Sequence, residues 1–594
     1  MTDKEMKRFI SKLFHEKKLS EILNEFRWIY GYGLKYKRSI LCFICLGIVG
    51  TVLGLAGSVI SKKIIDAVTG FDAAGLIMAI AFYAFFQIFN LSVSALCQRV
   101  SAKIEIKVDQ EIRADIYGKI MDSDWESLSE FHSGDLLNRV NSDVGSVASS
   151  VIGWMPELIT RSFQFVGTFA VIMYYDATLA LLALLSAPAI LLMSRTLTKR
   201  MRDYRKQMSE MNSEVMIFEE ETLQNVHLIK SFGVGGLYRE KFAQVQEKHK
   251  KIKLSYQNFT IVSGICMSVL GMLVTGACLG WGIYRLWSGH ITFGTMTLFL
   301  QLAGMLRGSF SSLVYMVPKA ISASTAAGRL MQITDLENEK YQFEEEAEKL
   351  INKNDGVTLR AENITFRYRS GKEIIVNSDF VAEPGEIIAV VGPSGEGKTT
   401  LFRILLGMVS VCEGSVEIGE NNGGLRVPVS AATRGLFSYV PQNNFMFFDT
   451  IAENMRLVNK DATDGEIISA LKQACAYEFV QALPDGIYSK IGENGSGFSE
   501  GQIQRLAIAR ALLSRAPIIL LDEATSALDS DTELKILHNV LEMNRHRTLI
   551  FVTHRPSILP MCNRVYRIDQ KMLRTVSFDE IRSTLTDNND ECKN

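Results

Sequence analysis

The 594-residue sequence has almost no net charge, no paired cysteine pattern and no recognisable secretory leader. Its 64 lysines and arginines nearly balance 65 aspartates and glutamates, so bulk charge favours neither nucleic acid nor an acidic substrate as a partner. The nine cysteines are scattered, and Cys42-x-x-Cys45 has no second pair to complete a metal site. We interpret these two cysteines as small apolar packing residues. No short apolar core with a small-residue cleavage site follows the basic start, so a removable signal peptide is not expected.

Apolar residues make up 47% of the chain and are concentrated before about residue 320. A helix needs about 20 apolar residues to cross a bilayer. Six segments meet this description: Ile40–Ser61, Ala73–Gln98, Gly153–Tyr175, Ala177–Ser194, Leu254–Tyr284 and a stretch from Ile291 to Pro318. The sequence therefore predicts six membrane helices, with both termini on the same side.

The distribution of basic residues indicates on which side of the membrane the termini lie. Arg99, Lys103 and Lys107 follow the second segment, and a cluster from Arg195 to Arg205 follows the fourth. Cytoplasmic loops are enriched in such residues, so both termini are predicted to be cytoplasmic. Residues 19–36 have helical amphipathic spacing. They could lie on the membrane surface or pack on protein, and the sequence alone leaves both readings open.

A glycine-rich loop is the strongest local motif in the second half of the chain. It follows the apolar run 387–391 and precedes a helical stretch, as a phosphate-binding loop requires. Lys398 would reach the β- and γ-phosphates, and the Thr399 hydroxyl would bind Mg²⁺. The predicted ATP-binding residues of the loop are Gly392, Pro393, Ser394, Gly395, Glu396, Gly397, Lys398, Thr399 and Thr400.

Two carboxylates end a second apolar run, 517–521. Such a run predicts a buried parallel strand, and ligands gather at the carboxyl ends of these strands. Asp522 is expected to hold Mg²⁺, directly or through water. Glu523 is expected to orient or deprotonate the attacking water.

Between these motifs, residues 495–502 read Gly-Ser-Gly-Phe-Ser-Glu-Gly-Gln. This stretch resembles the signature motif of ATP-binding cassette proteins, whose family form is Leu-Ser-Gly-Gly-Gln. Ser499, Gly501 and Gln502 match that form, whereas Phe498 and Glu500 depart from it. The resemblance implies that the signature of one cassette closes over ATP on the phosphate loop of another.

The same resemblance assigns four further positions. Tyr368 matches the aromatic residue that stacks on adenine. Gln442 matches the glutamine that contacts Mg²⁺ and couples it to the membrane domain, so the implied metal ligands are Thr399, Gln442 and Asp522. Residues 526–529 match the loop that crosses the dimer interface, and His554 matches the histidine that contacts the γ-phosphate.

The expected fold is an α-helical membrane domain of six transmembrane helices with long cytoplasmic extensions, fused to an α/β P-loop NTPase cassette. Such an arrangement resembles an exporter-type half-transporter, whose cytoplasmic loops carry short coupling helices. The predicted domains are a cytoplasmic N-terminus with an interfacial helix, the transmembrane domain, a linker, the ATPase cassette and a polar tail. Their ranges are 1–38, 39–320, 321–355, 356–577 and 578–594, respectively.

The resemblance implies ATP-driven export of an amphipathic or hydrophobic drug-like compound, peptide or lipid across the cytoplasmic membrane, with ATP and Mg²⁺ as cofactors. A lipid flippase and an ATP-gated channel or regulatory protein are the alternatives. The expected partners are a second copy or a related half-transporter, the lipid bilayer and the substrate, without nucleic acid. The expected location is a bacterial plasma membrane. Glu157, Arg161 and Arg307 are the charged residues expected at membrane depth. They could contact the substrate, or Glu157 and Arg161 could form an ion pair while Arg307 extends its charged group to the membrane surface.

Overall fold

The computed structural model of the protein describes residues 19–178, 180, 200, 203–204, 207–208, 210–353, 356–369, 371–393, 395–421, 423–492, 495–543, 547–553 and 559–577. The chain divides into two compact units. A helical unit comprises residues 1–118 and 133–335, and an α/β unit comprises residues 119–132 and 336–594. The short stretch 119–132 therefore belongs with the ATPase cassette, although the chain on both sides of it belongs to the helical unit.

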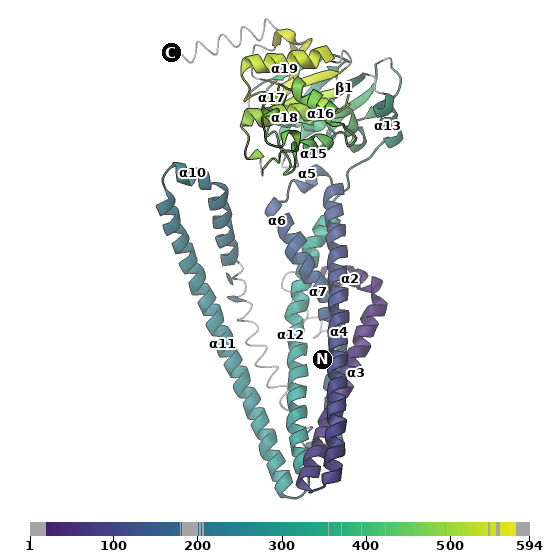
Figure 1. Cartoon of the computed structure of the whole chain (residues 1–594), viewed down its shortest axis with the longest axis vertical. Helices are drawn as coiled ribbons and strands as arrows, with labels where there is room; N and C mark the ends of the chain where they lie inside the picture. Colours follow the sequence, from purple (N-terminus) through teal and green to yellow (C-terminus); the bar gives the residue numbers. More distant parts are fainter. Residues whose placement is uncertain are drawn as a thin grey trace. The chain divides into compact units, whose positions relative to one another are not determined.

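Long helices form the helical unit (Figure 1). They are α2 (Leu19–Lys35), α3 (Lys37–Thr69), α4 (Ala73–Asp122), α8 (Met155–Tyr175), α11 (Gly235–Trp287) and α12 (Phe293–Thr334). Shorter elements are α6 (Ser133–Asn138), the π-helical turn η1 (Arg139–Asp143), α7 (Val144–Gly153) and α10 (Val226–Ser231).

Five of the six predicted spans overlap α3, α4, α8, α11 and α12, and the third and sixth begin two residues before α8 and α12. Of these, α3 and α4 are long and apolar enough to cross a membrane by length and composition. The fourth predicted span, 177–194, lies outside the described residues except for positions 177, 178 and 180. Helix α12 continues to Thr334, so the first part of the predicted linker 321–355 is the end of that helix.

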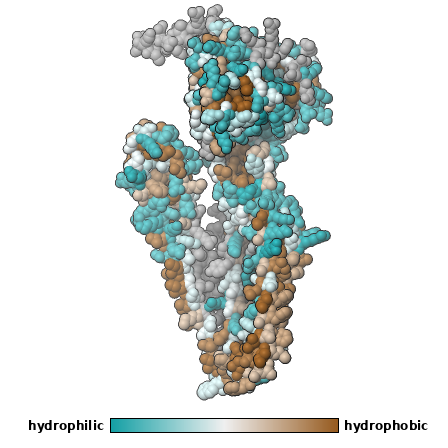
Figure 2. All heavy atoms as spheres, in the orientation of Figure 1, coloured by the Kyte–Doolittle hydropathy of each residue, from teal (hydrophilic) through white to brown (hydrophobic). Residues whose placement is uncertain are grey.

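The core of the helical unit lies between α3, α8 and α12. Leu55, Ile172, Leu298 and Leu302 are buried there. By contrast, α4 exposes large apolar side chains, and Figure 2 shows apolar residues gathered on the lower half of this unit. An apolar exterior of this kind suits a lipid environment.

Helix α2 packs on protein along one face. Ile22, Glu25 and Ile29 are buried, and Ser324 of α12 donates a hydrogen bond to Glu25. The opposite face exposes Leu23, among other apolar residues. The amphipathic spacing of residues 19–36 therefore reflects a helix that contacts α12, while its outer face keeps apolar side chains exposed.

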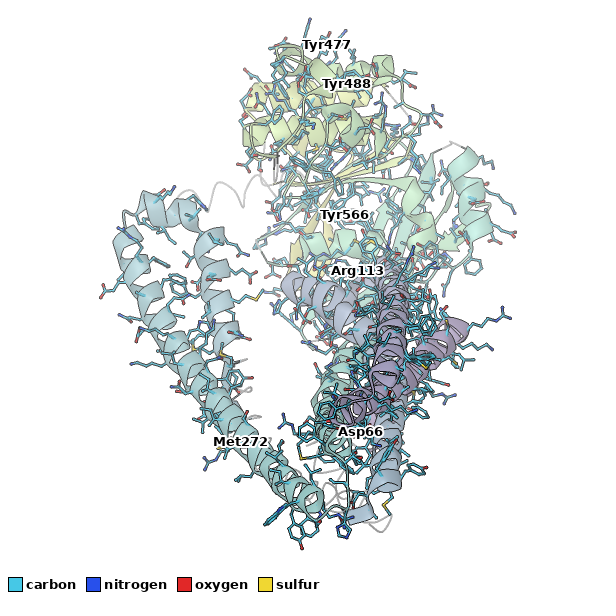
Figure 3. All side chains as sticks on the ribbon, turned by 60° about the horizontal axis from the view of Figure 1, so that its bottom comes forward. Asp66, Arg113, Met272, Tyr477, Tyr488 and Tyr566 are labelled. Carbon is cyan, nitrogen blue, oxygen red and sulfur yellow. The ribbon has the colours of Figure 1, made fainter. Side chains whose placement is uncertain are left out.

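Polar contacts fasten the helix ends near Asp66, which is labelled in Figure 3. Asp66 Oδ1 accepts a 3.0 Å hydrogen bond from the backbone N–H of Gly294 at the start of α12. A Cβ at Gly294 would lie 2.5 Å from the carbonyl oxygen of Lys62, so only glycine allows this approach. Nearby, Asp176 Oδ2 accepts hydrogen bonds from Nε and Nη2 of Arg285 at 3.0 and 2.8 Å.

Two sheets form the α/β unit. The four-stranded antiparallel sheet has the order β2-β1-β4-β5, and the six-stranded sheet has the order β10-β9-β3-β8-β7-β6. The first contains β1 (Val357–Arg367), β2 (Glu373–Ala382), β4 (Glu413–Glu420) and β5 (Arg426–Pro428). The second contains β3 (Ile387–Val391), β6 (Phe437–Val440), β7 (Ile518–Asp522), β8 (Thr548–Val552), β9 (Arg564–Asp569) and β10 (Met572–Val576).

Helices cover these sheets. They are α13 (Glu344–Lys353), α14 (Lys398–Leu405), α15 (Ile451–Arg456), α16 (Asp464–Gln473), α17 (Tyr477–Gln481), α18 (Glu500–Leu513) and α19 (Ser530–Met543), together with α5 (Trp125–Leu128) from the stretch 119–132. Strands β7 and β8 are buried at every residue, as expected for parallel strands covered on both faces.

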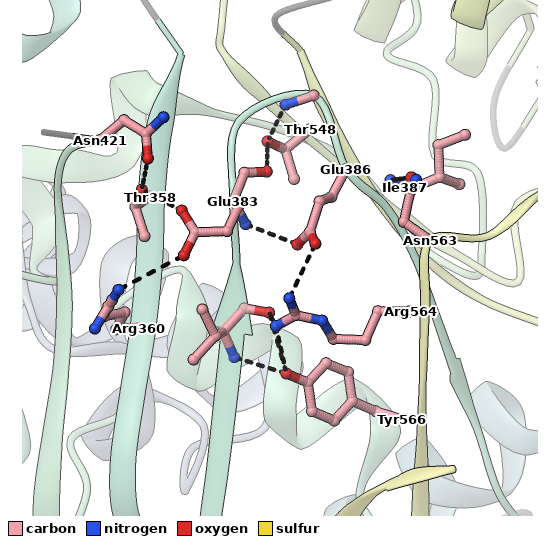
Figure 4. A network of polar contacts seen from close by, with 12 residues as sticks. Thr358, Arg360, Glu383, Glu386, Ile387, Asn421, Thr548, Asn563, Arg564 and Tyr566 are labelled. Carbon is pink, nitrogen blue, oxygen red and sulfur yellow. Dashed lines mark hydrogen bonds and ion pairs between the residues drawn. The ribbon is translucent and has the colours of Figure 1, made fainter. Parts of the chain in front are cut away.

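Strand pairing decides where the functional residues meet. Strands β3, β8, β7 and β6 are neighbouring and parallel, so their carboxyl ends lie at one edge of the sheet. A polar network holds the opposite end, where β3 begins (Figure 4). There, Arg564 donates to Glu386 at 3.0 Å, and the backbone N–H of Ile387 donates to Asn563 at 2.8 Å. These hydrogen bonds therefore fix the amino end of β3, the strand whose carboxyl end carries the predicted phosphate-binding loop.

Candidate functional site

The predicted phosphate-binding loop lies between the carboxyl end of β3 and the start of α14. Gly395 and Gly397 have φ angles of +84° and +104°, in the region that favours glycine. A Cβ at Gly397 would lie 2.5 Å from Cγ2 of Ile374, so a larger residue would also clash. Ser394 lies outside the described residues. The strand, glycine loop and helix predicted from the sequence are all present.

Lys398 begins α14 and is only 6% exposed. Its Nζ donates to the carbonyl oxygens of Gly392 and Pro393 at 2.8 and 3.0 Å. Burial lowers the pKa of the ammonium group, while Glu523 and Asp522 act in the opposite direction. The loop therefore holds a partly desolvated cation that could exchange carbonyl oxygens for phosphate oxygens.

Asp522 ends β7 and is 1% exposed. Burial raises the pKa of its carboxyl group, and a hydrogen bond from Thr399 opposes that rise. Tyr439 Oη also donates to Oδ2 of Asp522, at 3.4 Å. Sequence reasoning did not select Tyr439, and its only sequence signal is its place in β6, next to β7.

Glu523 and Gln442 are also neighbours. Gln442 follows β6 and Glu523 follows β7, and these two strands pair in parallel. Nε2 of Gln442 donates a 2.8 Å hydrogen bond to Oε2 of Glu523. Glu523 has a φ angle of +51°, a strained conformation for a non-glycine residue. The structure thus brings together Lys398, Thr399, Asp522, Glu523 and Gln442 from three strand ends.

The donor atoms at this edge suit Mg²⁺. The Thr399 hydroxyl, the Asp522 carboxylate and the Gln442 amide oxygen are hard oxygen ligands, and Asp522 is buried without an ion pair at bonding distance among the described residues. No group of three or more His, Cys, Asp or Glu side chains in the described part of the chain could hold a metal ion alone.

The signature-like stretch forms the start of α18. Ser499 is the N-cap, and its side chain accepts from the backbone N–H of Gln502 at 3.3 Å. The Gln502 side chain accepts in return from the backbone N–H of Ser499 at 2.8 Å. This capping box explains why a serine and a glutamine stand three positions apart. Glu500 lies in the first turn and is exposed, where a carboxylate complements the helix dipole.

Two residues of this region have structural roles that sequence reasoning missed. Phe498 packs edge-on against Phe479 with a centroid distance of 6.3 Å, so its departure from the family form adds a core contact. Gln504 is fully buried. Its side chain accepts from the backbone N–H of Ala527 at 3.0 Å and donates to Ser526 at 3.1 Å. Gln504 therefore fixes the loop 526–529 to α18.

Tyr368 follows β1 and is half-buried, with its ring edge-on to Phe366 at 4.8 Å. Its hydroxyl lies 3.2 Å from Oγ1 of Thr400, which places the ring beside the start of α14. The predicted histidine, His554, lies outside the described residues, directly after Thr553. Its predicted role stays a prediction.

This arrangement defines a P-loop nucleotide hydrolase fused to a helical membrane region. The family model "ABC transporter transmembrane region" matches residues 40–310, and the model "ABC transporter" matches residues 375–526. A lipid A-core flippase from Pasteurella multocida is 30% identical over 468 residues, covering 78% of this chain and 79% of that protein. The protein belongs to the ATP-binding cassette transporter family, as a half-transporter with one membrane domain and one cassette. Its enzymatic activity is ATP hydrolysis coupled to transport.

Other relatives give the same assignment. A fatty acid ABC transporter ATP-binding/permease protein from Mycobacterium bovis is 29% identical, over 75% of this chain and 70% of that protein. The structure of a bacterial Atm1-family ABC exporter with ATP bound has a TM-score of 0.77 and 22% identity, covering 92% of this chain and 96% of that one. That likeness confirms the predicted fold class.

Proposed function

We propose that the protein exports or flips a lipid or another amphipathic, largely apolar molecule, driven by ATP. The observation that carries this proposal is the edge of the six-stranded sheet where Lys398, Thr399, Asp522, Glu523 and Gln442 converge, in a chain that also carries the family's membrane region. The names of the relatives, a lipid A-core flippase and a fatty acid transporter, support the substrate class.

Each residue of the site has a separate proposed role in binding or hydrolysing ATP. Lys398 would neutralise the β- and γ-phosphates after it leaves the carbonyls of Gly392 and Pro393. Thr399, Asp522 and Gln442 would hold Mg²⁺, which supplies charge neutralisation across the β- and γ-phosphates. Glu523 would orient the attacking water and accept its proton. Tyr368 would stack on adenine, and His554 would contact the γ-phosphate.

The membrane charges fit an apolar substrate. Arg161 Nε lies 3.4 Å from Oε1 of Glu157, so these two residues form the ion pair that the sequence offered as one reading. Arg307 is exposed on α12. A strongly hydrophilic solute would meet many apolar partners along these helices, whose exposed side chains include numerous Phe, Met, Leu and Ile residues.

The working unit is proposed to be two copies of this chain in a bacterial plasma membrane. One chain carries a phosphate loop, a signature with its capping box, and the glutamate Glu523. No residue that the family pattern requires for hydrolysis is replaced at the positions of Lys398, Asp522 or Glu523. Two identical cassettes would therefore supply two complete sites.

The proposal is tested in proteoliposomes with the full chain, a fluorescent phospholipid as the transport probe, and ATP. We expect ATP-dependent movement of the lipid and stimulation of hydrolysis. Glu523→Gln should lower hydrolysis about 10²–10⁴-fold, as loss of a positioned base does. Glu453→Gln is the matched control, because Glu453 is an exposed acid paired with Arg456. ATP-driven uptake of a charged small solute, with no response to lipids or apolar compounds, would contradict the substrate class.

A further inference from the structure

Helix α5 contacts the cassette beside Tyr368, through hydrogen bonds to Arg369 and packing by Trp125. The backbone N–H of Arg369 donates to Oε1 of Glu126 at 3.2 Å, and its Nη2 donates to Oγ of Ser127 at 2.7 Å. Trp125 packs on the same buried cluster as Tyr368. All these residues belong to the α/β unit, although α5 comes from the loop that joins two membrane helices.

Arg403 joins the two aromatic residues of this contact. Its guanidinium carbon lies 4.5 Å from the ring centroid of Trp125. Its Nη1 donates a 3.0 Å hydrogen bond to Oη of Tyr368. Because that oxygen accepts from Arg403, the Tyr368 proton is available to Oγ1 of Thr400, 3.2 Å away. One side chain of α14 thus contacts both α5 and the residue expected to face adenine.

Burial decides which of these contacts matters most. The Arg369 side chain is 51% exposed, and its ion pairs with Asp124 and Glu130 are long, at 3.9 and 3.6 Å. Exposed ion pairs of this kind contribute little. Arg403 and Trp125 are both half-buried, and a cation over an aromatic face gains strength as water is excluded. Of the contacts that α5 makes here, the one with Arg403 is therefore the better shielded, and Arg403 also bonds the Tyr368 hydroxyl.

We propose that Arg403 is a positioning residue that couples occupancy of the adenine site to the seating of α5. If α5 is displaced, Arg403 loses the Trp125 face and its hold on Tyr368 weakens. Coupling between two sites is reciprocal, so bound ATP must in turn favour the seated α5. Arg403 would thus link the membrane loop to ATP affinity. The inference rests on the adenine-stacking role proposed for Tyr368.

The first test measures the ATP KM and kcat of the full chain in lipid nanodiscs. Arg403→Gln is expected to raise the KM about 5–10-fold with kcat within about twofold, because it loosens ground-state binding. Trp125→Ala should raise the KM similarly, while Trp125→Phe, which keeps an aromatic face, should stay near wild type. Arg403→Lys keeps the charge but loses the planar group, so its KM should lie between those of the wild type and Arg403→Gln.

The second test measures hydrogen exchange of residues 119–132 with and without ATP, in the Glu523→Gln background, which we expect to bind ATP without hydrolysing it. ATP should protect this segment, and the added Arg403→Gln change should abolish the protection. A purely structural role would raise exchange equally with and without ATP. If the KM rises while ATP still protects 119–132, the coupling is overturned and Arg403 only supports the Tyr368 ring.

Arg456→Gln serves as the control, because Arg456 forms ion pairs with Glu453 and Asp464 at 2.9 and 2.8 Å on another part of the cassette. It should leave the KM and the protection unchanged. A wild-type KM in both Arg403→Gln and Trp125→Ala would overturn the inference, and Trp125→Ala decides alone if Arg403→Gln does not fold. Absence of lipid transport by the wild-type protein, with the KM pattern intact, would instead overturn only the proposed substrate.

Discussion

Nε2 of Gln442 donates a 2.8 Å hydrogen bond to Oε2 of Glu523. This bond engages the amide nitrogen of Gln442 with the glutamate and leaves the amide oxygen as the atom that would take the Mg²⁺ position we propose for it. The two residues come from loops after neighbouring strands, β6 and β7. The side chain expected to sense the metal and the side chain expected to act on water are therefore one bonded unit.

We expect Gln442→Ala to weaken the apparent Mg²⁺ affinity several-fold and to lower kcat about tenfold, because it removes the metal ligand that we propose and the orienting bond together. The measurement is ATPase activity as a function of Mg²⁺ concentration. Saturating Mg²⁺ should restore only part of kcat, since the loss of orientation remains. Full recovery at high Mg²⁺ would show that the bond to Glu523 has no part in turnover.

Burial of the Asp522 carboxylate is expected to make the folded protein less stable at neutral pH. Burial raises the pKa of its carboxyl group above the unfolded value, so the folded state holds the proton more tightly and stability falls as pH rises through that window. Asp522→Asn should therefore raise the Tm of the nucleotide-free protein at pH 7–8. The gain should shrink as the pH falls and the Asp522 carboxyl takes up its proton, while the variant loses ATP hydrolysis. A lower Tm at pH 8 would refute this account.

Asp529 provides the control of opposite sign. The backbone N–H of Thr532 donates to its carboxylate at 2.9 Å at the start of α19, and this bond lowers the pKa of Asp529. Its stabilising effect is present above the unfolded pKa and is lost as pH falls through the lowered one. Asp529→Asn should therefore lower the Tm at neutral pH, and the two variants should shift in opposite directions.

Glu500→Gly should change the ATP KM by less than about threefold, because Glu500 is an exposed first-turn residue of α18 that favours the helix dipole by about 0.3–1 kcal/mol. Ser499→Ala is the contrasting variant. It breaks the capping box and should cost about 0.5–2 kcal/mol of stability. Thermal unfolding and ATP titration of both proteins separate these effects. A KM change of about 100-fold in Glu500→Gly would instead mean direct contact with nucleotide.

The sequence was most informative where function depends on local patterns. The glycine loop before Lys398, and the carboxylates Asp522 and Glu523 after an apolar strand, are consecutive residues whose backbone geometry follows from residue type. Their meeting was also predictable, because parallel strands share one carboxyl edge. Ser499 and Gln502 were selected by resemblance, and the capping box gives them a local physical role.

What the sequence did not reveal depends on contacts between distant segments. Nothing near Arg403 indicates Trp125, because the contact exists only when α5 packs on the cassette. Gln504 looks like an ordinary helical residue until Ser526 and Ala527 fold against it. Arg139 lies in the long polar stretch between the second and third predicted spans, and its partners on α12 could not be inferred from spacing.

Those partners support a last prediction, in the helical unit. Arg139 is buried, donates to Asp135 at 2.8 Å and to Gln332 of α12 at 2.9 Å, and begins the π-helical turn η1. Asp143, 3% exposed, ends that turn and pairs with Arg329 of α12. One ion pair, Asp143–Arg329, and one hydrogen bond, from Arg139 to Gln332, thus cross between η1 and α12. π-helical turns often mark functional sites.

We expect Arg329→Gln to destabilise the helical unit by about 1–3 kcal/mol, because it leaves a buried carboxylate without its cation. Each kcal/mol lost should lower the Tm by about 2–4 °C. Asp143→Asn should destabilise the unit less, since it removes the buried charge itself. The double variant should be more stable than the sum of the two single losses predicts, by an interaction energy of about 0.5–3 kcal/mol. Burial raises the pKa of Asp143, so the Arg329→Gln loss should diminish as acid protonates this carboxyl. Lys250→Gln, which breaks an exposed 3.3 Å pair with Glu247, is the control and should cost under about 0.5 kcal/mol. Equal losses for Arg329→Gln and Lys250→Gln would show that the buried pair adds no more than a surface contact.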